Sequence, residues 1–146
     1  LHEYVRSGGT LVVQYNTNRD PATEQIGPFP MTLSRDRVTV ESSPVTLMLP
    51  AHSLLATPNR ITEDDFADWV QERGLYFAET WDPRYEAPLG MVDPGEAMAQ
   101  GSLIAARYGT GMFIYTGLSF FRQLPAGVPG AYRLIANLVA GGRNSE

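Results

Sequence analysis

Two apolar spacings follow each other at the start of the chain and predict a helix and then a strand. Leu1, Tyr4 and Val5 have the i, i+3, i+4 spacing of a helix face, and Gly8-Gly9 ends that helix. The run TLVVQY at residues 10–15 is mostly apolar and β-branched, which is typical of a strand buried on both faces. This order predicts an α/β crossover that enters a parallel sheet. We expect the helix to start upstream of Leu1, in a longer protein of which this chain is a piece.

The middle of the chain is interrupted by six prolines between residues 21 and 58, which prevent long regular elements. Within this stretch, Val38–Val40 and Val45–Leu49 are expected to be short strands. A longer helix is predicted from Thr62, an N-cap with Asp65 at the N3 position, to a glycine stop at Gly74.

The last third of the chain carries the clearest local signals. Ser102–Tyr108 and Met112–Thr116 are strand-like and are joined by Gly109-Thr110-Gly111, which predicts a β-hairpin. A closing helix is predicted from Pro129 to a stop at Gly141-Gly142. Its apolar face is expected to consist of Tyr132, Leu134, Ile135, Leu138 and Val139.

Composition removes several kinds of chemistry. The chain of 146 residues has the length of about one domain. It has no Cys, and all 11 of its basic residues are Arg, which excludes a thiolate nucleophile, a disulfide framework, a Walker lysine and a Schiff-base lysine. With His2 and His52 as the only histidines, a three-histidine metal site cannot form within the chain. We expect no catalytic residue, no metal and no cofactor here.

Charge and hydropathy also restrict the partners. A net charge of −5 and scattered arginines argue against nucleic acid, because phosphate binding relies on a basic surface. No apolar run approaches 18 residues and no signal peptide is recognisable, so we expect no membrane span. The sequence does not indicate a compartment.

Three short segments are candidates for chemistry, each with a structural alternative. Trp81–Glu86 combines aromatic rings, a carboxylate and an Arg, which together can stack on a sugar ring and bind its hydroxyls. It is equally an Asp-Pro turn whose Arg pairs with an acid such as Glu72. Asp93–Glu96 holds two acids but has the sequence of an ordinary β-turn. His52 is interpreted as a hydrogen-bonded loop residue.

Loops that follow the strands of an open α/β sheet gather at its carboxyl edge, where ligands usually bind. We therefore predict a ligand site there. Its candidate residues come from three loops: Asn16, Asn18, Arg35, Trp81, Asp82, Arg84 and Tyr85.

Several long strings of the sequence resemble one protein family across nearly the whole chain. These strings are YVRSGGTLVVQYNTN, TLSRDRV, PNRITEDDFADWVQERGLYF, WDPRYEAPL and YTGLSFFRQLPAGVPGAYRLIANL. They resemble the C-terminal region of large bacterial PIG-L/LmbE-type deacetylase proteins, where a class I glutamine-amidotransferase-like domain follows the deacetylase. YVRSGGTLVV with the hairpin YGTGMFIYTG also resembles trehalose-utilisation-type (ThuA-like) domains.

The resemblance implies a flavodoxin-like α/β fold: a mostly parallel sheet with helices on both faces, ending in a β-hairpin and a helix. It implies a single partial domain over residues 1–146 that lacks its N-terminal strands. The family's zinc motif of the His-Pro-Asp-Asp kind does not occur here, and neither does the amidotransferase Cys. No catalytic residue is therefore carried over.

Three functions remain open on these grounds. The first is a non-catalytic accessory domain that binds carbohydrate beside the upstream deacetylase domain of the same polypeptide. The second is a divergent sugar hydrolase that uses acids of the 81–96 region, which would need two carboxyls of unequal pKa in one cleft. The third is a purely structural module. Because an apolar strand near Leu11–Tyr15 would lack its neighbour, we also expect the isolated chain to be a homo-oligomer.

Overall fold

The computed structural model describes residues 1–17, 19 and 23–143, which form a mixed α/β fold. Its helices are α1 (His2–Arg6), α2 (Ser53–Ala56), the 3-10 helix η1 (Glu63–Phe66), α3 (Phe120–Gln123) and α4 (Pro129–Ala140). Its strands are β1 (Thr10–Gln14), β2 (Met31–Leu33), β3 (Arg37–Val38), β4 (Val45–Leu47), β5 (Gly74–Leu75), β6 (Ala78–Trp81), β7 (Leu89–Met91), β8 (Leu103–Tyr108) and β9 (Gly111–Thr116). The predicted α/β class is confirmed.

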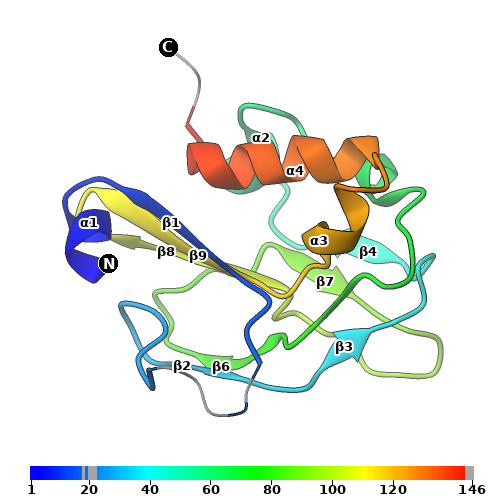
Figure 1. The fold of residues 1–146 in the computed structure, drawn as a ribbon, viewed down its shortest axis with the longest axis horizontal. Helices are drawn as coiled ribbons and strands as arrows, with labels where there is room; N and C mark the ends of the chain where they lie inside the picture. Colours follow the sequence, from blue (N-terminus) through cyan, green and yellow to red (C-terminus); the bar gives the residue numbers. More distant parts are fainter. Residues whose placement is uncertain (18, 20–22, 144–146) are drawn as a thin grey trace.

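The central sheet has the strand order β1-β9-β8 (Figure 1). Strand β1 runs parallel to β9, with Thr10 opposite Met112 and Gln14 opposite Thr116. Strands β8 and β9 form the predicted antiparallel hairpin, which confirms the glycine signal at residues 109–111. Strand β1 thus has one parallel neighbour, but β9 follows it in the chain, so the crossover predicted to enter β1 from upstream stays a prediction.

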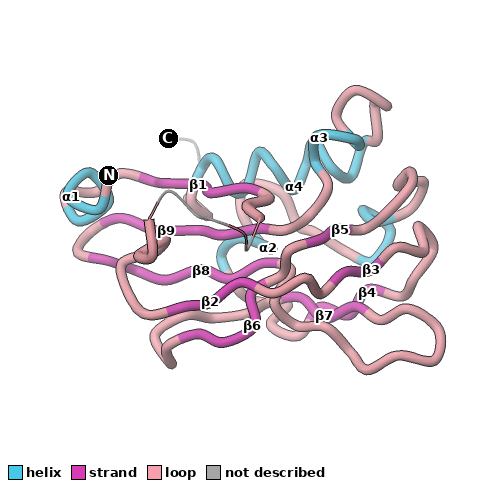
Figure 2. The backbone as a smooth tube through the Cα atoms, turned by 60° about the horizontal axis from the view of Figure 1, so that its bottom comes forward, coloured by secondary structure: helices cyan, strands magenta, loops and turns pink. Residues whose placement is uncertain are grey.

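The prediction of a mostly parallel, flavodoxin-like sheet is not confirmed. The other strands of the described residues form three two-stranded antiparallel ribbons, β2-β6, β3-β5 and β4-β7 (Figure 2). Proline-rich connections leave strands of only two to four residues in these ribbons, and such strands pair with distant partners instead of extending the sheet.

Side-chain alternation along the central strands divides the core into two clusters. Val12, Met112 and Ile114 point to the face covered by α4, α2 and η1. Leu11, Val13, Phe113 and Tyr115 point to the opposite face, which is covered by the β2-β6 ribbon, its flanking loops and Val5 of α1. Figure 1 shows α2, α3 and α4 gathered on one side of the sheet. The predicted second layer of helices is therefore replaced mainly by this ribbon.

The long helix predicted from Thr62 to Gly74 is wrong beyond its first turn. Thr62 N–H donates to Asp65 Oδ2 at 2.9 Å, as the predicted N-terminal signal requires. The next carbonyls, however, are taken by side chains: the Trp69 indole N–H donates to Asp65 O at 2.9 Å, and the Arg73 guanidinium donates to Phe66 O. Asp68 and Gln71 then adopt left-handed backbone angles, so the helix ends at Phe66.

Helix α4 matches the predicted closing helix, with Pro129 in its first turn and Gly141 in the left-handed conformation that ends it. Its predicted face is partly wrong. Leu134 and Leu138 are buried, but Tyr132 is 50% and Val139 is 68% exposed.

Strand β1 is not buried on both faces as predicted. It lies at one edge of the sheet, and its first four side chains are only half-buried.

Candidate functional site

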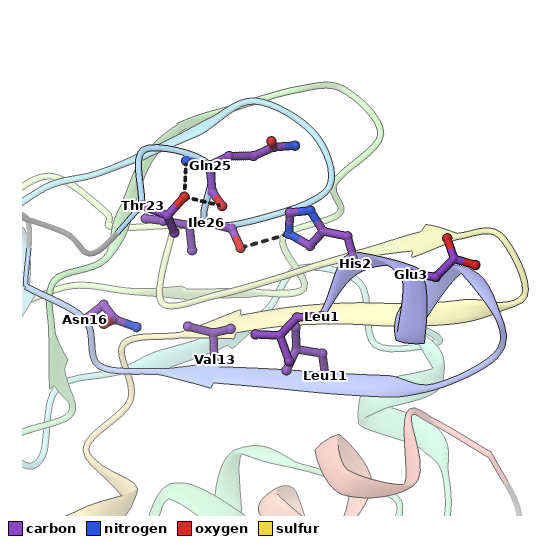
Figure 3. A pocket seen from close by; sticks show the side chains of 9 residues that line it. All are labelled: Leu1, His2, Glu3, Leu11, Val13, Asn16, Thr23, Gln25 and Ile26. Carbon is purple, nitrogen blue, oxygen red and sulfur yellow. Dashed lines mark hydrogen bonds between the residues drawn. The ribbon is translucent and has the colours of Figure 1, made fainter.

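Two adjoining cavities surround the segment from residue 23 to residue 32, each with a volume of about 570 Å³. The first lies beside β1 and α1, where its lining is mainly apolar (Figure 3): Leu1, His2, Glu3, Leu11, Val13, Asn16, Thr23, Gln25 and Ile26. The second lies over the β2-β6 ribbon and has a mixed lining: Glu24, Gln25, Ile26, Pro28, Phe29, Pro30, Met31, Thr32, Thr80, Trp81 and Asp82. The second cavity therefore combines aromatic, hydroxyl and carboxylate groups.

Asp82 and Arg84 form a fixed ion pair at the rim of this second cavity. Arg84 Nε donates to Asp82 Oδ1 at 2.8 Å and Nη2 donates to Oδ2 at 3.0 Å, so the contact is bidentate. The Arg84 guanidinium also lies 3.7 Å from the centre of the Phe29 ring. Hydrogen bonds from the Arg84 side chain and backbone lower the pKa of Asp82 to about 2. Asp82 is therefore an ionised acceptor. Arg84 pairs with Asp82 and not with Glu72, the acid predicted as its partner, which is bound by Arg122 instead.

Trp81 and two threonines supply the rest of the polar and aromatic lining. Trp81 ends β6 opposite Met31, and it is half-buried against the cluster that contains Phe113. Its indole N–H has no hydrogen-bond partner among the described residues. Thr32 and Thr80 lie opposite each other, with their hydroxyl oxygens 2.6 Å apart. Thr32 Oγ1 also accepts from Thr80 N–H at 3.2 Å, so the Thr80 hydroxyl oxygen is the one that keeps a lone pair for a polar ligand.

Tyr85 supports the cavity from within the core. Its side chain is 4% exposed, and its hydroxyl donates to Phe29 O at 2.8 Å and accepts from Phe29 N–H at 3.2 Å. Both hydrogen-bonding directions of the hydroxyl are thus used within the fold. Tyr85 holds Phe29 in position, and the predicted direct contact with a ligand is not supported by this geometry.

Tyr85→Phe is expected to lower the free energy of unfolding by about 1–2 kcal/mol, because it leaves the Phe29 backbone groups without their partner. Chemical denaturation monitored by circular dichroism measures this change. Tyr4→Phe is the matched control, since Tyr4 is 59% exposed and its hydroxyl makes no hydrogen bond among the described residues. Equal stability of the two variants would contradict the supporting role of Tyr85.

The structure does not gather all predicted ligand residues at one place. Trp81 and Asp82 line the second cavity, and Asn16 lines the first. Arg35 lies at a separate cavity with Glu96 and Met98. Asn18 lies outside the described residues.

Asp93 and His52 have structural roles at positions away from these cavities. Asp93 accepts hydrogen bonds from Thr39 N–H at 2.8 Å, Val40 N–H at 3.1 Å and Ser43 Oγ at 2.5 Å. Burial works to raise the pKa of Asp93, but these hydrogen bonds outweigh it and the pKa lies below its usual value. His52 Nδ1 accepts from Leu54 N–H at 3.2 Å at the start of α2, which confirms the hydrogen-bonded interpretation.

Sequence reasoning missed the contributions of Phe29, Thr32 and Thr80. Phe29 is flanked by Pro28 and Pro30, a pattern that indicates a fixed loop but not its neighbour. The two threonines are 48 residues apart in sequence, and only the pairing of β2 with β6 brings them together.

None of the helices described at residues 1–17, 19 and 23–143 has the length and apolar character needed to cross a bilayer. Within the same residues, no group of three or more His, Asp and Glu side chains is arranged to hold a metal ion. Comparisons with protein-family models, curated proteins and solved structures find no match to this chain.

Proposed function

We propose that this chain is a non-catalytic accessory domain that binds carbohydrate in the cavity over the β2-β6 ribbon. One observation carries the proposal: Trp81, Asp82 and the Thr32–Thr80 hydroxyl pair line the same cavity. An indole supplies an apolar surface with a polar N–H, and a carboxylate and hydroxyls bind the rim of a sugar ring. The Asp82–Arg84 contact fixes the carboxylate before a ligand arrives, which reduces the entropy lost on binding.

The pKa values of Asp82 and Asp93 favour sugar binding over sugar hydrolysis. Glycoside hydrolysis needs a carboxyl with a raised pKa to protonate the leaving group. The pKa values of Asp82 and Asp93 are both lowered. Asp93 is also bound to the 39–43 segment instead of the cavity that Asp82 lines. Asp82 and Asp93 therefore do not form a catalytic pair of unequal pKa in one cavity.

The ligand class rests on the resemblance to the C-terminal region of PIG-L-type deacetylases. Such deacetylases act on N-acetylated sugars, so the proposed ligand is an N-acetylhexosamine unit of a glycan. The proposed partner is a deacetylase domain in the same polypeptide, for which this domain would hold the glycan.

Titration with N-acetylglucosamine and its β-1,4-linked disaccharide tests this proposal by NMR. The chain has two tryptophans, and Trp69 is only 2% exposed. We expect the indole N–H signal of Trp81 to shift with added sugar and that of Trp69 to stay in place. Trp81→Ala is expected to weaken binding by about tenfold or more, because it removes the aromatic surface.

Phe121→Ala is the matched control for the loss of an aromatic side chain, because Phe121 is 50% exposed and lies on α3, away from the cavity. It should bind the disaccharide as the unmodified chain does. Shifts that spread equally to both tryptophans, or no shift at millimolar sugar, would contradict carbohydrate binding at this cavity.

A further inference from the structure

Among the residues that the structure describes, the outer edge of β1 has no backbone hydrogen-bond partner. Met112 N–H donates to Gly9 O and Tyr15 N–H donates to Thr116 O, so the odd-numbered residues of β1 face β9. In a parallel ladder the alternate residues point the other way, which places the N–H and C=O groups of Thr10, Val12 and Gln14 at the outer edge. No backbone hydrogen bond joins these groups to another described residue on that side.

The opposite edge of the sheet, strand β8, is protected from pairing with another chain, unlike β1. On the outer side of β8, Ala105 exchanges two backbone hydrogen bonds with Glu86, at 2.8 and 2.9 Å. Strand β8 also carries Arg107, and a charge on an edge strand discourages pairing with another chain. Strand β1, with the sequence TLVVQ, has no charged residue and no proline.

Apolar surface flanks the open edge on both sides of the sheet. On the helical side, Tyr132 and Val139 of α4 are exposed and lie next to the partly buried Ile135, on the side turned away from the buried contacts with η1 and Asn59. Helix α4 packs against β1, and Figure 1 shows it above this strand. On the other side, Leu1, which is 86% exposed, lies beside Leu11 and Val13 in the first cavity (Figure 3). An uncharged edge between two apolar surfaces is typical of a protein interface.

We propose that β1 pairs with β1 of a second copy of this chain, antiparallel and centred on Val12. This register pairs Thr10 with Gln14 of the partner and Val12 with its own copy, so each outward-facing residue meets another and exchanges both backbone hydrogen bonds. Leu11 then lies opposite Val13 of the partner on the cavity side. The strand is thus complementary to itself, and no charges of like sign meet within it.

The ends of the strand provide a test of this register. Arg143 Nη2 donates to Thr10 Oγ1 at 3.0 Å and to Gly8 O at 3.1 Å, so a positive charge lies beside the start of β1. In the proposed dimer, Gln14 of the partner faces this position. Gln14 is exposed, and its replacement leaves the core of the protomer unchanged.

Sedimentation equilibrium of the full chain at micromolar concentrations is expected to give a mass near twice the 16.1 kDa of one chain. Gln14→Lys should weaken the dimer by about tenfold, because it places two lysines beside the two partner arginines. Gln14→Glu, the matched variant of opposite charge, should leave the dimer as strong or make it stronger.

A mass of one chain at every concentration would overturn the proposal, because β1 would then not pair with a second copy. A dimer that Gln14→Lys and Gln14→Glu weaken equally, or that neither variant changes, also overturns it, because its interface would then lie elsewhere. Thermal unfolding of both variants as in the unmodified chain verifies that the protomer fold is retained.

Discussion

Asp93→Ala is expected to lower the free energy of unfolding by about 3 kcal/mol, which corresponds to a fall in Tm of about 10 °C for a domain of this size. The Asp93 carboxylate, in a residue that is 7% exposed, binds two backbone N–H groups and two hydroxyls of the 39–43 segment. Alanine leaves these donors without an acceptor in a place that water reaches poorly. Urea denaturation monitored by tryptophan fluorescence measures the change.

Glu96→Ala is the matched control, since Glu96 belongs to the same turn and is exposed. It should change the free energy of unfolding by less than about 0.5 kcal/mol. A similar loss in both variants would show that the turn, and not the hydrogen bonds of Asp93, determines the effect.

The stability that Asp93 supplies has a defined pH dependence. Because the pKa of Asp93 in the fold lies below its usual value of 3.8, its contribution is fully present above pH 3.8. The contribution is lost as the pH falls through the lowered pKa, where the folded carboxylate becomes protonated. The stability difference between the unmodified chain and Asp93→Ala should therefore be constant near neutral pH and shrink below pH 3.8.

Local signals in the sequence predicted those elements whose stabilising contacts are also local. The turn at residues 109–111 selects the β8-β9 hairpin, and Pro129 and Gly141 set the ends of α4. The helix predicted from Thr62 ends early because a side chain from beyond its first turn binds a backbone carbonyl that the helix would need. Arg73, seven residues beyond Phe66, takes the carbonyl that the next helical turn would have used. Helix propensity and capping carry no information about such a contact.

The sheet was predicted less well because most of its pairings join distant residues. Strand β1 has the composition of a strand buried on both faces, but burial depends on its neighbours, and β9 is its only paired strand among the described residues. The β2-β6 and β4-β7 pairs join segments more than 40 residues apart, and strands of three or four residues have too little pattern to indicate a partner.

In the candidate site, too, local features were predicted and long-range contacts were not. Aromatic and charged residues at 81–85 singled out this loop, and Trp81 and Asp82 do line a cavity. The sequence could not indicate that the Tyr85 hydroxyl bonds to the Phe29 backbone or that the Arg84 guanidinium lies over the Phe29 ring. These contacts join residues that are 56 and 55 positions apart. The predicted gathering with Arg35 depended on a parallel sheet edge that these ribbons do not form.

Asn137→Asp is expected to lower the free energy of unfolding by about 4 kcal/mol at neutral pH, although the two side chains have nearly the same shape. The Asn137 side chain is fully buried in α4. Its Nδ2 donates to Leu54 O at 2.9 Å and to Asn59 O at 2.7 Å, while its Oδ1 accepts from Asn59 N–H at 2.9 Å. A carboxylate loses both donated bonds and places a negative oxygen against two carbonyl oxygens.

The pH dependence of this variant separates the electrostatic effect from a packing defect. Burial and the facing carbonyls raise the pKa of a carboxyl at position 137 in the fold, so the cost of ionising it grows as the pH rises from the unfolded pKa towards this raised pKa. As the pH falls, the protonated carboxyl regains one donor, and the stability difference from the unmodified chain should shrink by pH 4. Ala136→Asp on the same helix is the control, since Ala136 is exposed and its replacement should change stability little. A cost in Asn137→Asp that stays the same from pH 7 to pH 4 would show that packing, and not the hydrogen bonds of Asn137, joins α4 to the 54–59 segment.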